Sequence, residues 1–239
     1  FLTNYQMQNP IHNKNRLSAY RSVRAAAFNN ASKVRDQLAD NWPEIIVYIL
    51  LLAIAAGMRL WDLGARAMHH DESLHAYYSF NLASGLGYDH NPMMHGPFQF
   101  EATAMVFNIF GDSDYTARLL YALAGTLIVA LPILLRYRIG KPAAVITAAL
   151  LTFSPTMLYF SRFARNDIIV AVWTLGLVIC LWRFLDTGKT RYLYMVAVFL
   201  GLAFATKENV YLIVATLGMY IVAYVASTVY RDTMPSIVS

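Results

Sequence analysis

The sequence predicts an all-α polytopic membrane protein with about six transmembrane helices and two further helices lying on the outer surface of the membrane. Of its 239 residues, 58% are hydrophobic and only 14% are charged, whereas soluble domains carry about 25% charged residues. Six apolar stretches come close to the length of about 20 residues that crosses a bilayer. Because lipid cannot satisfy unpaired backbone groups, each of these stretches must be a helix.

The predicted spans follow a basic N-terminal segment. They cover residues 44–60, 117–135, 142–160, 168–185, 192–206 and 210–229. The chain therefore divides into a basic cytoplasmic tail (1–43), a first transmembrane helix (44–62), an outer loop (63–116), five further transmembrane helices (117–230) and a cytoplasmic end (231–239). Apolar residues at helical spacing within 16–40 predict an amphipathic helix, either on anionic lipid or docked on a partner. The chain stops soon after the sixth span, which predicts a fragment.

Lys and Arg decide the orientation, including that of the ambiguous apolar segment 95–111. If this segment lies on the outer surface, 13 of the 19 basic residues fall on one side, which the positive-inside rule makes cytoplasmic. The other side then receives six: Arg59, Arg66, Arg118, Arg162, Arg165 and Lys207. Most acids and five of the six histidines also fall on that outer side. The residues capable of chemistry are thus predicted to gather there.

The first outer loop carries Asp71, Glu72 and His75 at the start of a predicted short helix. Asp71 and His75 lie one turn apart on one face, and Glu72 and His75 form a Glu-x-x-His pair. Carboxylates beside histidines suit a general base or a hard metal ion. The alternative is an acidic first turn that only complements the helix dipole.

Three later features lie on the same predicted side. His95 precedes Gly96-Pro97, where it could meet the acidic loop or be an ordinary interfacial histidine. Arg162, Arg165 and Asp167 follow the third span; the arginines could grip a phosphate or snorkel to the interface. Lys207, between the fifth and sixth spans, could supply a point charge to a phosphate or belong to a simple turn.

The order of these motifs resembles a known family. Asp71-Glu72, His95-Gly96-Pro97, "GDSDYTARL" at 111–119, Arg165-Asn166-Asp167 and Thr206-Lys207 follow one another as in polytopic glycosyltransferases of the C-type fold. Within these, the chain resembles the dolichyl-phosphate-mannose-protein mannosyltransferases and their aminoarabinose-transferase relatives, most of all the prokaryotic flippase-activity-associated group. The resemblance covers about residues 45–210 and implies the N-terminal part of that fold.

The resemblance implies roles for individual residues. Asp71 corresponds to the catalytic base, Glu72 helps to shape the site, and Asp167 and Lys207 match a later acid and the lysine of the cavity. Arg165, Lys207 and Arg162 are expected to neutralise the donor phosphate. His95 stands where the family often has His-Pro-Pro or Glu-Lys-Pro, and its role as a phosphate or metal neighbour stays open. No cofactor is required by this interpretation, although Glu72, His75 and His95 are the candidate ligands if a divalent metal ion is used.

The function predicted is an inverting glycosyltransferase of the plasma membrane with a cytoplasmic N-terminus. It would move a sugar from a polyprenyl-phosphate donor to an acceptor hydroxyl on the outer face. The alternative is a non-catalytic, glycosyltransferase-like scaffold subunit of a larger membrane complex. The expected partners are the donor lipid, the bilayer and, for the alternative, other membrane subunits; no nucleic-acid partner is expected.

Overall fold

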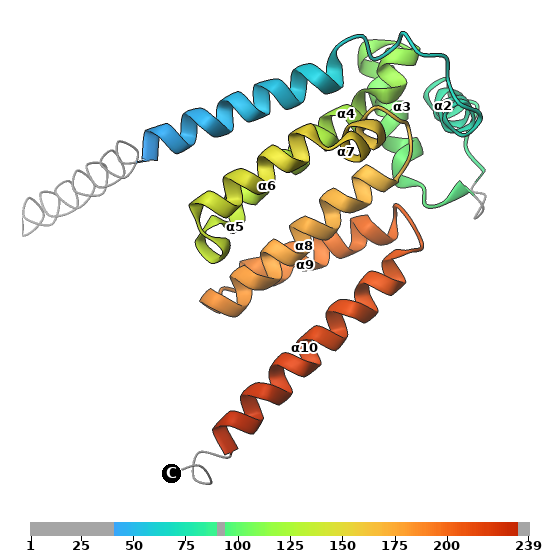
Figure 1. Ribbon diagram of the computed structural model, residues 1–239. Coiled ribbons are helices and arrows are strands. Elements are labelled where there is room, and N and C mark those ends of the chain that lie inside the picture. Colours follow the sequence, from blue (N-terminus) through green and yellow to red (C-terminus); the bar gives the residue numbers. More distant parts are fainter. Residues whose placement is uncertain (1–40, 90–93, 234–239) are drawn as a thin grey trace, which may run out of the picture. The chain divides into compact units, whose positions relative to one another are not determined.

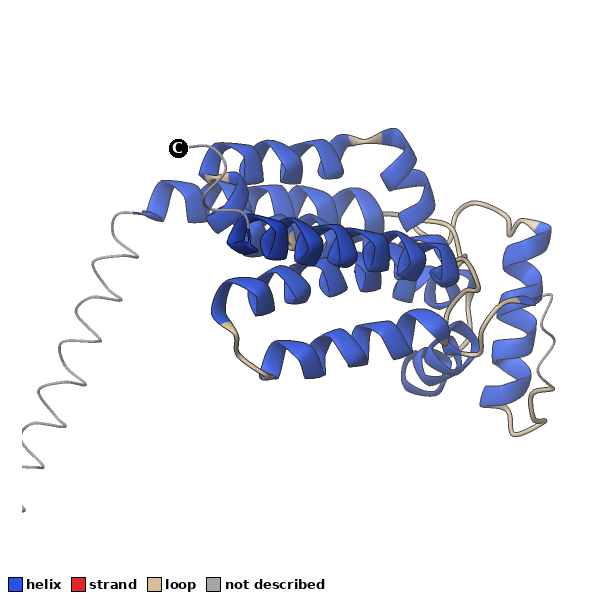
Figure 2. Cartoon of the chain, turned by 90° about the horizontal axis from the view of Figure 1, so that it is seen from below, coloured by secondary structure: helices blue, strands red, loops and turns tan. Residues whose placement is uncertain are grey.

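The computed structural model describes residues 41–89 and 94–233, with side chains to residue 230. All regular structure in these residues is helical, as Figure 2 shows. The predicted amphipathic helix at 16–40 and the residues just before Met94 lie outside the described residues. The described residues from Tyr48 onward belong to one compact unit; of the other unit, only residues 41–47, the start of the first helix, are described.

Four helices are long and apolar enough to cross a membrane. They are Asn41–Leu60, the continuous pair α4 (Asp114–Ala130) and α5 (Pro132–Ile139), α8 (Asp167–Thr187) and α10 (Val210–Thr233). A fifth candidate is the bent pair α6 (Lys141–Phe153) and α7 (Pro155–Ser161). The predicted fifth span corresponds to α9 (Arg191–Phe204), which is apolar but only 14 residues long. The chain is therefore a multi-pass membrane protein.

The predicted third span is broken. Residues 142–160 were expected to form one helix, but α6 and α7 meet at Ser154 with a bend of 62°. The break falls at Pro155, which has no N–H to donate and disfavours the helical conformation in the residue before it. Ser154 is accordingly extended, with φ −61° and ψ 121°, and its hydroxyl accepts a hydrogen bond from the Met157 N–H to begin the new helix. Leu131, before Pro132, stays helical, so the span of α4 and α5 is not broken in this way.

Two shorter helices follow the first span, as the sequence predicted. They are α2 (His70–Ala83) and α3 (Phe98–Phe110), and Figure 1 shows both at one end of the spanning helices. The loops that join the first helix to α2, α7 to α8 and α9 to α10 lie at this same end. We call it the loop end; the residues singled out in the sequence meet there.

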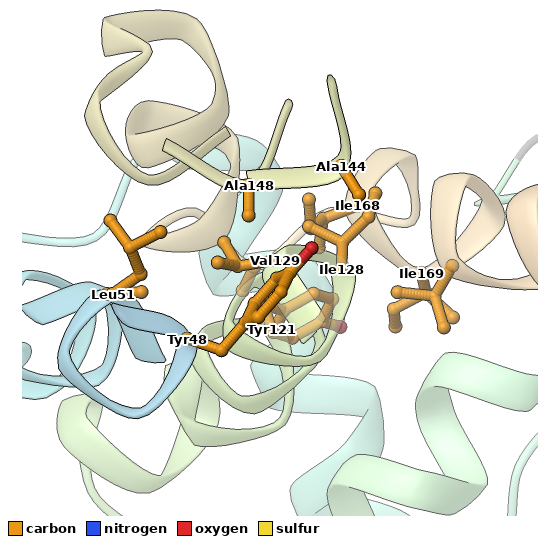
Figure 3. Close-up of a cluster of buried hydrophobic side chains, with 12 residues drawn as sticks. Tyr48, Leu51, Tyr121, Ile128, Val129, Ala144, Ala148, Ile168 and Ile169 are labelled. Carbon is orange, nitrogen blue, oxygen red and sulfur yellow. The ribbon is translucent and has the colours of Figure 1, made fainter. Parts of the chain in front are cut away.

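The core lies where α4, α6 and α8 pack against the first helix from Tyr48 onward. Figure 3 shows Tyr121, Ile128 and Val129 of α4 facing Ala144 and Ala148 of α6. Both alanines are fully buried, and small residues let helix backbones approach closely in a membrane. This packing fixes the ends of α4 and α8, which carry charged residues into the loop end.

Candidate functional site

Four charged side chains form a continuous row at the loop end. Arg165 Nη1 lies 3.5 Å from Asp71 Oδ2, and its Nε lies 4.0 Å from Asp167 Oδ2. Lys207 Nζ donates a hydrogen bond of 2.6 Å to Asp167 Oδ1. We call Asp71, Arg165, Asp167 and Lys207 the charged row. It joins the first turn of α2, the α7–α8 loop, the start of α8 and the α9–α10 turn.

The row is accessible to solvent. Asp71 is 40% exposed, Arg165 and Asp167 are similarly exposed, and Lys207 is more enclosed. Exposed ion pairs of this kind contribute only about 0–1 kcal/mol. The contacts within the row can therefore give way to an incoming anionic group at little cost.

His95 reaches the same place from the segment before α3. Its Nδ1 lies 2.9 Å from Oε2 of Glu208, the residue after Lys207. The Gly96 N–H donates to the Thr206 carbonyl at 3.1 Å. A Cβ at Gly96 would collide with the Ala205 carbonyl, so only glycine allows this close approach. Glu208 follows Lys207 on the predicted outer side, but its contact with His95 was not predicted from the sequence.

Glu208 stays ionised beside this histidine. The hydrogen bond from its own backbone N–H and the contact with His95 lower the pKa of its carboxyl below the ordinary value. Glu208 is itself largely exposed. Glu208 therefore places a carboxylate charge at the end of the charged row next to Lys207.

Glu72 has a very different environment from its neighbour Asp71. Its side chain is fully buried. Oε1 accepts hydrogen bonds from Arg118 Nε at 2.8 Å and from the Ala164 N–H at 3.0 Å. Oε2 accepts from Arg118 Nη2 at 3.0 Å, from Arg66 Nη2 at 2.8 Å and from the His69 N–H at 3.0 Å. We call Glu72, Arg66 and Arg118 the Glu72 hub.

The hub keeps Glu72 charged and caps α2. Burial alone would raise the pKa of its carboxyl, but the bonds from Arg118, Ala164 and His69 outweigh this, and the pKa is lowered. The bond to the His69 N–H satisfies a donor at the start of α2. For Glu72, the structure thus matches the alternative of an acidic first turn that stabilises the helix.

His75 lies beneath the charged row. It is buried, its ring packs edge-on against Phe100, and its Nδ1 bonds to the Ala164 carbonyl at 3.0 Å. Burial lowers its pKa, as do the nearby charges of His95 and Arg165, while the Ala164 carbonyl and Asp71 act in the opposite direction. Because a carbonyl can only accept, Nδ1 carries a proton, and the lowered pKa favours the neutral ring.

These positions do not fit a metal centre. Both carboxylate oxygens of Glu72 are held by arginines and backbone N–H groups, and His75 Nδ1 is bonded to a carbonyl. No group of three His, Cys, Asp or Glu side chains that could hold an ion exists in the part of the chain that the structure describes. The proposed set Glu72, His75 and His95 is therefore not brought together as ligands.

Arg162 does not join the charged row. Its Nη1 donates to the carbonyls of Met58, Arg59 and Trp61, and its Nη2 donates to the carbonyl of Asp62. These are the last carbonyls of the first helix and its exit, where a cation complements the helix dipole. The expectation that Arg162 joins Arg165 and Lys207 at one phosphate is not met by this geometry.

Two arginines that the sequence analysis treated only as outer charges are buried. Arg118 belongs to the Glu72 hub, and Arg59 bonds to Ser161 Oγ and to the carbonyls of Ala55 and Leu151. The signal was available, because an arginine at the edge of an apolar span is costly unless it has partners. What the sequence could not supply was the identity of those partners.

The fold and the charged row define a polytopic membrane protein with a polar site at one end of its spans. The chain belongs to the dolichyl-phosphate-mannose-protein mannosyltransferase family, whose model matches residues 94–239. This confirms the family inferred from the order of the motifs. Asp71 and Glu72 lie before the matched region.

A solved structure shares the fold. The crystal structure of ArnT from Cupriavidus metallidurans in the apo state superimposes with a TM-score of 0.64 at 19% sequence identity. The match covers 83% of this chain and 39% of that chain, so this chain spans well under half of the ArnT length. No curated protein matches the sequence.

Proposed function

We propose that this protein is a membrane glycosyltransferase that moves a sugar from a polyprenyl-phosphate donor to an acceptor hydroxyl on the outer face of the membrane. The observation that carries the proposal is the charged row, in which Asp71 lies 3.5 Å from Arg165 and Asp167 links Arg165 to Lys207, a second cation from a distant segment. Membership of the mannosyltransferase family supports the same reaction class.

The row contains the groups that this reaction needs. Asp71 takes the proton of the acceptor hydroxyl as the acceptor oxygen attacks the anomeric carbon from the side opposite the leaving group. The bond from that carbon to the phosphate oxygen breaks, and its electron pair leaves with the polyprenyl phosphate. Arg165 and Lys207 neutralise the charge that grows on this phosphate, and the configuration of the sugar inverts.

The other residues act on these groups. Asp167 contacts both Arg165 and Lys207 and so holds the two cations side by side. The Glu72 hub fixes the start of α2 and hence the position of Asp71. His95 and Glu208 hold the segment before α3 against the α9–α10 turn. We assign Glu72, Asp167 and His95 as positioning residues.

The proposed side of the membrane follows from the opposite end of the helices. That end carries a group of basic residues in the turns of α5, α6, α8 and α9: Arg136, Arg138, Lys141, Arg183, Lys189 and Arg191. At the loop end, Arg59, Arg118 and Arg162 have internal partners and Arg66 is paired with Glu72. The positive-inside rule then puts the loop end outside and the N-terminus in the cytoplasm of a plasma-membrane protein.

Two experiments test the proposal. Transfer of labelled sugar from polyprenyl phosphate by the full-length protein in reconstituted membranes should depend on Asp71. A cysteine at exposed Ser84, in a Cys180→Ala background, should react with an impermeant reagent from outside, and one at Lys189 should not. Tight binding to other membrane subunits with no transfer by the wild-type protein would replace the enzyme with the scaffold alternative.

A further inference from the structure

A second polar feature of the loop end lies outside the charged row. Two adjoining hollows run between the end of the first helix and α7. One, of about 320 Å³, is lined by Leu63, Arg66, Pro155, Leu158, Tyr159 and Arg162. The other, of about 590 Å³, shares Leu158 and Arg162 and adds Gly57, Met58, Trp61 and Asp62. We call the two hollows together the Arg162 groove.

The groove carries an uncompensated positive charge. The guanidinium group of Arg162 bonds to carbonyl oxygens, and among the described residues no carboxylate is paired with it. Arg66 is half exposed and shares the single carboxylate of Glu72 with Arg118. The lining of the groove contains two arginines, Arg66 and Arg162, and one acid, Asp62. One positive charge is left for a ligand.

The aromatic residues place the groove at the level of lipid head groups. Trp61, directly after the first span, is 81% exposed, and Tyr159 is half exposed. Amphipathic rings of this kind gather at the membrane–water boundary. The guanidinium group of Arg66 lies 5.9 Å from the centre of the Tyr159 ring. The groove thus offers arginines at its polar end and Met58 and Leu158 along its apolar wall.

We propose that the Arg162 groove binds a phospholipid with an anionic head group. The phosphate would lie against Arg66 and Arg162, and an acyl chain would follow Met58 and Leu158. Such a site is separate from the charged row, because neither arginine contacts Asp71, Arg165 or Lys207. The proposal does not depend on the transfer reaction.

Trp61 is a natural reporter of occupancy. The full-length protein is reconstituted into phosphatidylcholine vesicles that contain phosphatidylglycerol, with bromine on the acyl chains of one lipid or the other. Subtracting the signal of a Trp61→Phe variant isolates the quenching at Trp61. Brominated phosphatidylglycerol should quench Trp61 more than its share of the bilayer predicts. Quenching in proportion to composition would overturn the proposal.

Charge variants identify the site. Leu158→Glu adds a negative charge to the groove without removing a hydrogen bond, and Leu158→Gln is the matched neutral control. A charge near the surface is worth about 1 kcal/mol, so Leu158→Glu should weaken the preference about fivefold and Leu158→Gln should leave it nearly unchanged. Arg66→Gln should give a similar loss, and Arg191→Gln, at the other end of the helices, should give none.

Competition separates a phospholipid site from a donor site. Unbrominated polyprenyl phosphate should not relieve the quenching by brominated phosphatidylglycerol, and Arg165→Gln should leave the quenching intact. Displacement by polyprenyl phosphate would show that the groove binds the donor, which contradicts the proposal. Equal losses in Leu158→Glu and Leu158→Gln would show that packing, and not charge, determines the preference.

Discussion

Asp71 and Glu72 are adjacent in the sequence, yet they belong to two regions with opposite properties. Glu72 is fully buried and accepts five hydrogen bonds, including three from two arginines. Asp71 is 40% exposed, and its contact with Arg165 is 3.5 Å long. A buried carboxylate whose hydrogen-bonding capacity is filled stabilises the fold. An exposed and loosely paired carboxylate can exchange partners and take a proton.

The difference arises from the geometry of α2. Successive residues on a helix point in directions about 100° apart, so Glu72 faces the interior while Asp71 faces the loop end. Arg118 of α4 covers Glu72, and Arg165 of the α7–α8 loop covers part of Asp71. A pair of adjacent acids can therefore divide between stability and chemistry.

The largest expected effect is on the stability of the Glu72 hub. Arg118→Met leaves a buried carboxylate with only part of its compensation, and breaking a buried ion pair typically costs about 3–5 kcal/mol. We expect most of the protein to be lost from the folded fraction, as judged by thermal unfolding in detergent. Arg191→Met, an exposed control, should unfold like the wild type. Equal stability of the two variants would remove the structural role of the hub.

The next effect concerns the transfer rate at Asp71. Asn has nearly the same size but cannot accept the proton, and removal of a general base costs about 10²–10⁴-fold in rate. Asp71→Asn should therefore lose transfer while its unfolding temperature stays near that of the wild type. If the variant instead keeps its rate, Asp71 is not the base. Loss of the fold would favour the alternative in which Asp71 only stabilises the first turn of α2.

Weaker binding of the donor is expected when the cations of the charged row are replaced. Arg165→Gln and Lys207→Gln each remove a charged hydrogen bond, worth about 1.5–3 kcal/mol, so donor affinity should fall about 10- to 100-fold. Both cations contact Asp167, so the double variant should lose less than the product of the single losses. Titration with polyprenyl phosphate measures this, and a fully multiplicative loss would argue against one shared phosphate.

A smaller effect is expected from pH. The pKa of His75 is lowered from 6.5, so the unfolded chain takes up this proton first, and stability falls as the pH drops below about 6.5. The pKa of Glu72 is lowered from 4.5, so its contribution is complete above that value and is lost at lower pH. Unfolding temperature against pH should show both declines. His75→Gln should remove only the first, and an unchanged profile in that variant would exclude His75 as its source.

The sequence by itself determined the helical membrane class, the family, and the end of the helices at which the polar residues gather. These follow from local properties. The length of an apolar stretch predicts a span, and the order of the motifs can be read from the sequence without knowing which residues are in contact. The juxtamembrane segment before α4 was also predicted correctly as a helix that is not one of the spans. The break at Ser154 was not predicted, because a proline bends the chain by 62° at Pro155 whereas the helix continues through Pro132.

Only the tertiary structure decided which charged residues face each other. Arg162 and Arg165 are three residues apart, yet one binds the end of the first helix and the other lies between Asp71 and Asp167. Arg118 and Glu72 come from different helices, and nothing in their spacing announces a shared bidentate contact. The partners of each charged residue depend on how α2, α4 and the α7–α8 loop pack. Burial makes the Glu72 carboxylate require its arginines, whereas solvent lets the Asp71 carboxylate exchange partners.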